Sequence, residues 1–124
     1  MIPTQHWIFR AKIVDIVDGD TVTLEIDQGM HCRRVERVRL LHVDTPELRG
    51  VLDRAPGLAA RQFVADWWGV VSALNVPYPL VVQTVKTDSF GRYLCDIWRE
   101  VDGANLSNDL LSSGNAVTYE GGSR

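Results

Sequence analysis

Apolar residues in the first third of the chain recur with the two-residue period of half-buried strands. Residues 8–17 (IFRAKIVDIV) predict a first strand, and residues 21–26 alternate cleanly enough to predict a second. A third strand is expected over residues 34–43, with Pro46 ending it because proline cannot donate to a sheet ladder. Its apolar spacing slips near Val35, which favours a bulge or a late start to regular pairing.

A helical spacing begins after Pro56, where apolar residues recur every three or four positions. Trp68 is expected beside this apolar stripe and partly exposed. Pro77 is expected to end the helix, whose predicted core-facing positions are Ala60, Phe63, Trp67, Val70 or Val71, and Leu74.

The last part of the chain returns to strand character and ends in a short helix. Residues 79–85 and 92–99 predict two strands, joined by a turn over residues 87–91. Residues 105–111 predict a helix, with Gly114 as its C-cap. Five strands with a helix after the third predict an α+β OB-fold, a five-stranded Greek-key barrel with two or three helices.

Composition and charge narrow the class of protein. The length of 124 residues, with 45% hydrophobic and 23% charged residues, predicts a single domain over residues 1–124. No apolar run could cross a membrane and the N-terminus lacks a secretory pattern, so we expect a cytoplasmic protein unless a signal was removed or another export route is used. Cys32 and Cys95 match no metal or redox spacing; we expect two reduced thiols, with a single disulfide left open.

Charged residues gather where the predicted strands end. The first turn contributes Asp20, the end of the third strand contributes Arg39, Asp44 and Glu47, and the last hairpin contributes Arg92. Carboxylates and a carbonyl hold Ca²⁺ or Mg²⁺, and arginines match two phosphate oxygens at once. A further carboxylate can orient or deprotonate the attacking water. The net charge of -3 argues mildly against a simple nucleic-acid binder, but a bound cation would offset part of it. These residues predict metal-dependent phosphodiester hydrolysis.

Four segments, in this order, resemble the thermonuclease family typified by staphylococcal nuclease: VDGDTVTL, VRLLHVDTPE, KTDSFGR and NLSNDLLSSGNA. The resemblance runs from Ile13 to Ala116. It implies a nuclease that cleaves DNA and RNA with little sequence preference, breaks the 5′ P–O bond and leaves 3′-phosphates. We expect it to act on these substrates as a monomer, with no membrane partner.

The resemblance also implies roles for single residues. The metal would be Ca²⁺, with Mg²⁺ or Mn²⁺ as alternatives, held by the carboxylates of Asp20 and Asp44 and the carbonyl of Thr45, with Asp18 beside it. The catalytic residues would be Arg39 and Arg92, which clamp the scissile phosphate, and Glu47, which handles the water.

The sequence departs from the family at the substrate contacts. Ser89 and Phe90 stand where the family usually has a lysine and a tyrosine that contact the nucleotide, so we expect weaker substrate binding. Tyr119 is the candidate for a family tyrosine that stacks on the nucleotide. The family continues into a further helix beyond this point, which leaves the stability of residues 1–124 alone open.

Structural alternatives remain for each charged residue. Asp18 and Asp20 suit a solvated turn, and surface ion pairs are open for Arg39 with Glu36 or Glu47, and for Arg92 with Asp88. Strict alternation would place Arg39 and Asp44 on opposite sheet faces, so a shared site requires Asp44 to lie beyond the regular strand.

Two other functions compete with a nuclease. One is a non-catalytic OB-fold module that binds single strands or a protein partner, and the other is a hydrolase of a different phosphodiester. A degenerate module would have lost part of the charged set, whereas this chain keeps all of it: Asp20, Arg39, Asp44, Glu47 and Arg92.

Overall fold

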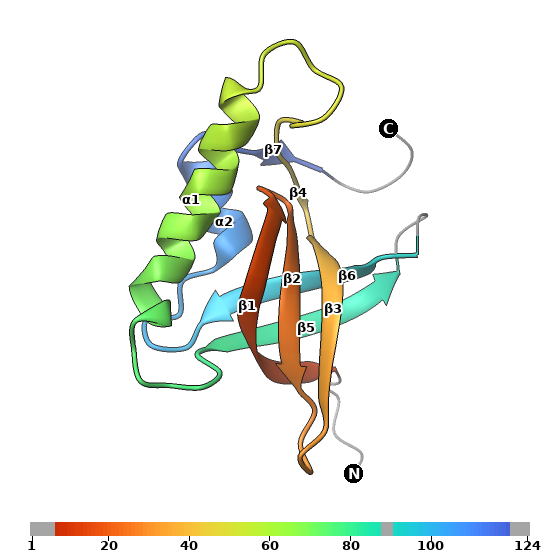
Figure 1. Cartoon of the computed structure of the whole chain (residues 1–124), viewed down its shortest axis with the longest axis vertical. Coiled ribbons are helices and arrows are strands. Elements are labelled where there is room, and N and C mark those ends of the chain that lie inside the picture. Colours follow the sequence, from red (N-terminus) through yellow and green to blue (C-terminus); the bar gives the residue numbers. More distant parts are fainter. Residues whose placement is uncertain (1–6, 88–90, 120–124) are drawn as a thin grey trace.

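A closed barrel of five strands dominates the part of the chain that the computed structural model describes, residues 7–87 and 91–119 (Figure 1). Neighbours around the barrel are antiparallel except for one parallel pair, β3 with β6. This confirms the predicted α+β OB-fold. In spatial order the strands are β1 (Ile8–Asp18), β2 (Thr21–Asp27), β3 (Arg33–Leu40), β6 (Tyr93–Arg99) and β5 (Leu80–Thr87).

The bulge expected near Val35 is absent, because β2 and β3 pair in one unbroken register from Thr21 opposite Arg39 to Asp27 opposite Arg33. The register shifts lie in β1 instead, between Ile13 and Asp15 and again further along the strand. Val35 is 59% exposed, because side chains alternate along a strand and Val35 lies on the outward face, opposite the face of buried Val38. The apolar spacing is therefore irregular because Val35 is an exposed apolar residue, and not because the strand register changes.

The third strand ends at Leu40, earlier than the predicted boundary at residue 43. His42, expected within the strand, is exposed in a turn and has a left-handed backbone with φ of 67°. The chain then forms a two-residue strand β4 (Val43–Asp44), which pairs with β7 (Val117–Thr118). Asp44 thus lies beyond the regular strand, as a shared site with Arg39 requires.

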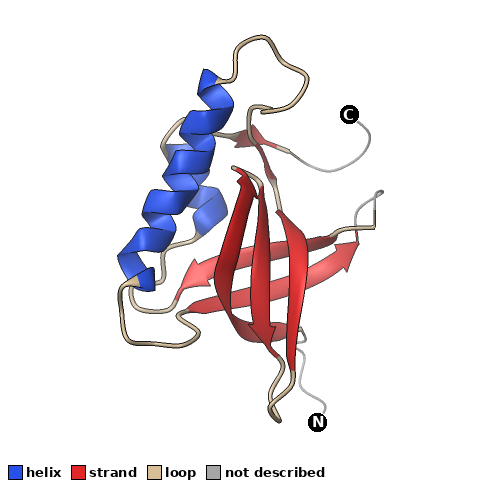
Figure 2. Ribbon diagram, in the orientation of Figure 1, coloured by secondary structure: helices blue, strands red, loops and turns tan. Residues whose placement is uncertain are grey.

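The long helix α1 (Ala55–Ser72) lies along one side of the barrel, with its buried face toward the core (Figure 2). Ser72 ends the helix, so the prediction that Pro77 ends it is wrong, and Leu74 lies beyond it and is 42% exposed. Val70 is also exposed, and Phe63 is only half-buried. The buried stripe is Gly57, Ala60, Val64, Trp67 and Val71, and Trp68 beside it is half-buried as predicted.

The short helix α2 (Leu106–Ser112) packs against α1 and β6. Asn105 caps its start, and Ser113, not Gly114 as predicted, is the residue at its C-cap. Gly114 follows with φ of 80° and donates its N–H to the Leu111 carbonyl, which satisfies one of the last carbonyls of the helix. Glycine is favoured there because its φ is positive.

One continuous core joins the inward faces of the strands to the buried sides of α1 and α2. Cys95 lies in this core, where burial raises the pKa of its thiol to about 12, whereas Cys32 is exposed in the β2–β3 turn. Both thiols are free, as expected. No helix in the described part of the chain combines the length and the apolar character that a membrane span requires.

Candidate functional site

Arg39, near the end of β3, is the centre of the charged cluster. Its side chain is only 5% exposed, and its Nη2 atom lies 3.3 Å from Asp44 Oδ1 and 3.5 Å from Asp20 Oδ2. The two carboxylate oxygens are therefore no further apart than these distances combined. Three of the predicted site residues, which come from two segments of the chain, thus meet at one point.

Main-chain groups and one aromatic ring fix the Arg39 guanidinium in place. Its Nη1 atom donates to the Leu40 carbonyl at 3.1 Å and to the Val43 carbonyl at 3.0 Å. The guanidinium carbon lies 4.8 Å from the centre of the Tyr119 ring. Tyr119 is held in turn by its N–H, which donates to the His42 carbonyl at 2.8 Å. The Arg39 guanidinium is thus preorganised by the turn and by the β4–β7 pair.

Asp20 is buried at the start of β2, with 8% of its surface exposed. One carboxylate oxygen accepts the Thr45 N–H at 3.2 Å, and the other accepts the Thr21 hydroxyl at 3.1 Å. Asp20 therefore joins the first turn to the segment after β4. A carboxylate this buried requires such donors, because an unpaired buried charge is strongly unfavourable.

Gly19 explains why the short segment DGD precedes the second strand. A Cβ atom at this position would lie 2.8 Å from the Ala60 Cβ and 2.9 Å from the Thr45 Cγ2, both closer than real contacts allow. Only glycine lets the turn approach α1 and Thr45 together. The solvated-turn alternative for the two acids is therefore wrong for Asp20, whereas Asp18 is half-buried at the end of β1.

The oxygen atoms around Arg39 fit a hard divalent cation. Asp20 and Asp44 supply carboxylates, and the hydroxyl of Thr45 is buried without a hydrogen-bond partner among the described residues. Oxygen ligands of this kind suit Ca²⁺, Mg²⁺ and Mn²⁺. Within the described ranges no three His, Cys, Asp or Glu side chains form a metal cluster, but the predicted set is of another kind, two carboxylates and a carbonyl.

Glu47 and Arg92 are placed by different parts of the fold. Glu47 is exposed, and its carbonyl oxygen would lie 2.6 Å from a Cβ on Gly57, so the start of α1 packs closely on this part of the chain. Arg92 is half-buried and immediately precedes β6, whose first residue pairs with Val38, the neighbour of Arg39. The β3–β6 pairing thus brings Arg92 near Arg39 along the backbone, whereas Glu47 is placed by its contact with the start of α1.

One of the alternative surface ion pairs can be compared with the structure, whereas another and two predicted substrate contacts fall outside the described residues. A surface pair between Arg39 and Glu36 does not form, because Arg39 is buried and Glu36 instead contacts Arg34 at 3.0 Å. Ser89 and Phe90, the predicted substrate contacts, lie outside the described residues, as does Asp88, the alternative partner of Arg92.

Sequence reasoning missed three contributors: the amide and hydroxyl of Thr45, the close approach at Gly19 and the left-handed turn at His42. Only the glycine between two aspartates gave a signal, and a two-aspartate turn alone does not reveal that a helix lies against it.

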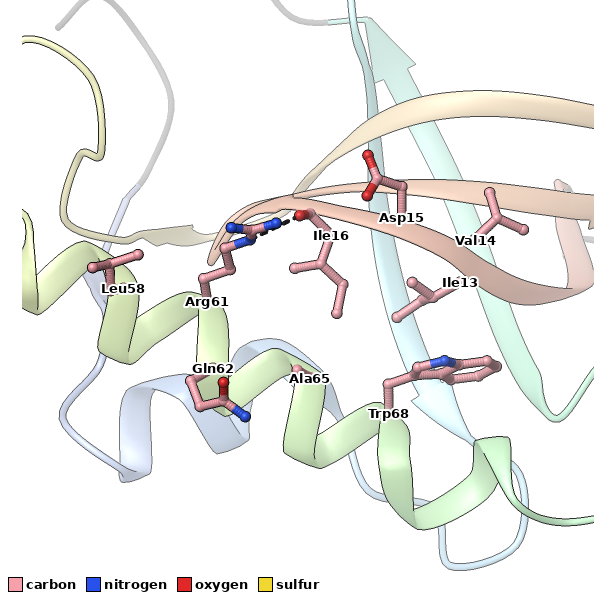
Figure 3. Close-up of a pocket in the computed structure, with 9 residues that line it drawn as sticks. All are labelled: Ile13, Val14, Asp15, Ile16, Leu58, Arg61, Gln62, Ala65 and Trp68. Atoms are coloured by element: carbon pink, nitrogen blue, oxygen red, sulfur yellow. Dashed lines mark hydrogen bonds between the residues drawn. The ribbon is translucent and has the colours of Figure 1, made fainter.

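A cavity among the described residues lies elsewhere, between β1 and α1 (Figure 3). Its volume is about 510 Å³, and none of the predicted site residues lines it. Arg61 crosses it to donate to the Ile16 carbonyl at 3.0 Å, and the Trp68 ring forms part of its wall (Figure 3). The charged cluster therefore does not lie in this cavity.

Comparison with known proteins gives the family. The family described as staphylococcal nuclease homologues matches residues 37–124. The protein ParB of Escherichia coli is 31% identical over 112 residues, which are 90% of this chain and 54% of ParB. An uncharacterised protein of Methanocaldococcus jannaschii is 29% identical over 133 residues, covering 92% of this chain and 61% of that protein.

A third relative is an uncharacterised endonuclease of Escherichia coli O157:H7, 25% identical over 112 residues, which are 90% of this chain and 61% of the relative. The chain thus spans between 54% and 61% of the length of these curated relatives. The family match covers more than half of the chain and includes the end of β3, β4 and both helices. The chain belongs to the family of staphylococcal nuclease homologues.

Proposed function

We propose that the chain is a metal-dependent nuclease that hydrolyses phosphodiester bonds of DNA and RNA with little sequence preference and leaves 3′-phosphates. Family membership and the relative named as an endonuclease support nuclease chemistry. The observation that carries the proposal is the contact of Arg39 with both Asp20 and Asp44 in a nearly buried pocket.

The proposed metal ligands are Asp20, Asp44 and the carbonyl of Thr45, with Ca²⁺ as the working ion and Mg²⁺ or Mn²⁺ as alternatives. When bound, such an ion supplies Lewis-acid stabilisation of a phosphoryl oxygen. Asp18 remains beside this set without binding the ion. The hydrogen bonds that Asp20 accepts from Thr21 and Thr45 hold its carboxylate in one orientation.

The chain's own residues supply the remaining parts of the reaction. Arg39 is fixed by two main-chain carbonyls, so its guanidinium is positioned before substrate arrives. In the proposal Arg39 and Arg92 donate to the phosphate oxygens, where negative charge builds up as water attacks. The exposed carboxylate of Glu47 orients that water and accepts its proton. Tyr119 keeps Arg39 in place and borders the nucleotide. Ser89 and Phe90 stand where the family usually has a lysine and a tyrosine, so the substrate binds more weakly.

The test is incubation of the purified protein with single-stranded DNA and RNA in Ca²⁺, Mg²⁺, Mn²⁺ or chelator. We expect cleavage only with metal, products that end in 3′-phosphate, abolition in Arg92→Ala and a sharp decrease in Glu47→Gln. Arg37→Ala is the matched control, because Arg37 is an exposed arginine on the same strand as Arg39. Tight binding without cleavage under every metal condition would instead support a non-catalytic OB-fold module.

A further inference from the structure

A second cavity, of about 410 Å³, opens at the mouth of the barrel. It lies where the start of β1, the hairpin half of β3 and the start of β6 meet, on the side away from α1 and α2 (Figure 1). Val38 of β3 faces the core, and because side chains alternate along a strand, Glu36 and Arg34 continue the same inward face to the rim. Mouths of barrels are common ligand sites, and this volume is within their usual range.

Arg34 forms a flat cationic surface at this mouth. Its guanidinium lies 5.3 Å from the centre of the Tyr93 ring, and its Nε atom donates to Glu36 Oε2 at 3.0 Å. The side chain is nevertheless 48% exposed. One face of the guanidinium therefore packs toward tyrosine while much of the side chain stays accessible. Guanidinium planes and aromatic rings of this kind are the surfaces on which proteins stack unpaired bases.

Two further aromatic residues line the same mouth. Trp7 is 66% exposed, although its carbonyl is fixed to β5 by the Thr84 N–H at 3.0 Å. Phe9, two residues further along β1, is half-buried in the cavity. A large exposed indole beside an apolar cavity favours a ligand with an aromatic face, because stacking removes its surface from water.

The mouth and the proposed catalytic site share one strand, β3. Arg34 and Arg39 lie on the same strand, about 17 Å apart at the usual rise of roughly 3.3 Å per residue. Tyr93 directly follows Arg92 in the chain. Arg33, also exposed on β3, adds positive charge on this strand, which favours a nucleic-acid backbone. OB-folds bind about 4–16 nucleotides of single strand, a length that reaches both places.

We propose that the barrel mouth binds an unpaired nucleobase of the substrate, stacked between the Arg34 platform and Trp7, a few nucleotides from the bond that is cleaved. The statement about cleavage rests on the proposed nuclease function; the binding site itself does not. A base in a duplex is paired and already stacked, so this site gives a preference for single strands. The ligand class is a nucleobase, which DNA and RNA share.

The test measures binding without cleavage. Fluorescence anisotropy in chelator follows a labelled 12-nucleotide thymidine strand, a uridine strand of the same length and the thymidine strand annealed to its complement. We expect the single strands to bind more tightly than the duplex, and Trp7→Ala and Tyr93→Ala to weaken binding of the single strands. The expected loss for Trp7→Ala is about 5- to 150-fold, the range that one base–aromatic stack provides. Tyr93→Ala acts through Arg34, whose guanidinium loses the ring it packs against.

Two variants serve as controls. Tyr93→Phe keeps the ring and should bind like the parent protein. Trp68→Ala removes an aromatic side chain from the other groove, between β1 and α1, and should leave affinity unchanged (Figure 3). Thermal unfolding checks that each variant is folded, and Trp7 is exposed enough that its replacement should not disturb the core.

The results separate this proposal from the nuclease proposal. If Trp7→Ala and Tyr93→Ala bind the strands within twofold of the parent protein, or if the duplex binds as tightly as the single strands, the mouth is not a base site. Metal-dependent cleavage in the same preparation would then leave the nuclease proposal standing alone. Conversely, a large loss of affinity in both variants would support the base site at the barrel mouth. If no metal also gave cleavage, the nuclease proposal would be wrong.

Discussion

Two arginines of the barrel, Arg39 on β3 and Arg99 at the end of β6, lie in surroundings that look alike. Each guanidinium carbon is 4.8 Å from the centre of an aromatic ring, Tyr119 for Arg39 and Trp67 for Arg99. Their side chains are 5% and 13% exposed, and each donates to at least one main-chain carbonyl. Burial, ring contact and hydrogen bonding therefore do not distinguish a binding arginine from a structural one.

The acids around the two arginines do distinguish them. Arg99 contacts Asp102, three residues further along, at 2.8 Å, and the same carboxylate accepts the Ala104 N–H at 3.1 Å. This is a local pair that closes a turn. Arg39 contacts Asp44, five residues further along, and also Asp20, which comes from the turn between β1 and β2 and meets Arg39 only through the fold. The proposed metal site requires carboxylates brought together from distant segments, and this is the contrast between the two arginines.

The largest effect is expected when each arginine is removed. Arg39→Ala should lower the cleavage rate by about 10³-fold or more, because it removes a guanidinium aimed at the transition state. It should also destabilise the fold by about 3–5 kcal/mol, since Asp20 stays buried without this partner. Arg99→Ala should lower stability and leave the rate of the folded protein unchanged. Initial rates measure the effect on cleavage, and urea unfolding measures the effect on stability. Equal rate losses in the two variants would contradict the different roles assigned to Arg39 and Arg99.

Glu47→Gln should reduce cleavage by about 10²-fold or more, because an amide cannot accept the proton of the attacking water. Its stability should not change, since Glu47 is exposed. Glu100→Gln is the control, a carboxylate beside Arg99 that forms an exposed pair with Arg10. Single-turnover rates with Ca²⁺ compare the two, and an unchanged rate in Glu47→Gln would assign the base to another group.

Calcium should raise the unfolding temperature of the parent protein, and Asp44→Asn should abolish that rise. A ligand at a hundred times its Kd stabilises the folded state by about 2.7 kcal/mol. Asp102→Asn should keep the full rise, because its carboxylate serves the turn at Arg99. Thermal melts with and without Ca²⁺ give the answer without any activity assay. If Asp102→Asn alone abolished the rise in unfolding temperature, the ion would bind beside Arg99 and not at the proposed site beside Arg39.

The smallest effect concerns acid pH. The hydrogen bond from the Ala104 N–H, together with Arg99, holds the pKa of Asp102 below its usual value. A carboxyl with a lowered folded pKa stabilises the protein above its unfolded pKa, and this contribution is lost as pH falls through the folded pKa. Asp102→Asn should therefore lower the urea midpoint slightly at pH 7 and have no effect at pH 2. An equal decrease at both values would contradict this cause.

Much of the fold was predictable, because strand and helix periods are local properties of the sequence. Alternation identified β2, and the apolar stripe identified α1. The boundaries were not predictable to the same degree. β3 ends at a left-handed turn at His42, and α1 ends before Pro77, because tertiary contacts and not the nearest proline set both ends.

The site was predictable in its members and not in its construction. The charged residues Asp20, Arg39 and Asp44 stand at strand ends in the sequence, and the fold brings them into contact. The buried hydroxyl of Thr45 and the close approach at Gly19 depend on how near α1 packs to the first turn. The distance between α1 and the first turn is set by the packing of the core, so no local sequence pattern could predict it.

Anomalous diffraction from crystals grown in saturating Mn²⁺ separates the two arginine clusters most directly. The convergent acids at Arg39 predict one strong peak at coordination distance from the carboxylates of Asp20 and Asp44. A peak at Asp102 beside Arg99, or no peak at Asp20 and Asp44, would contradict the assignment of the Arg39 cluster as a metal site.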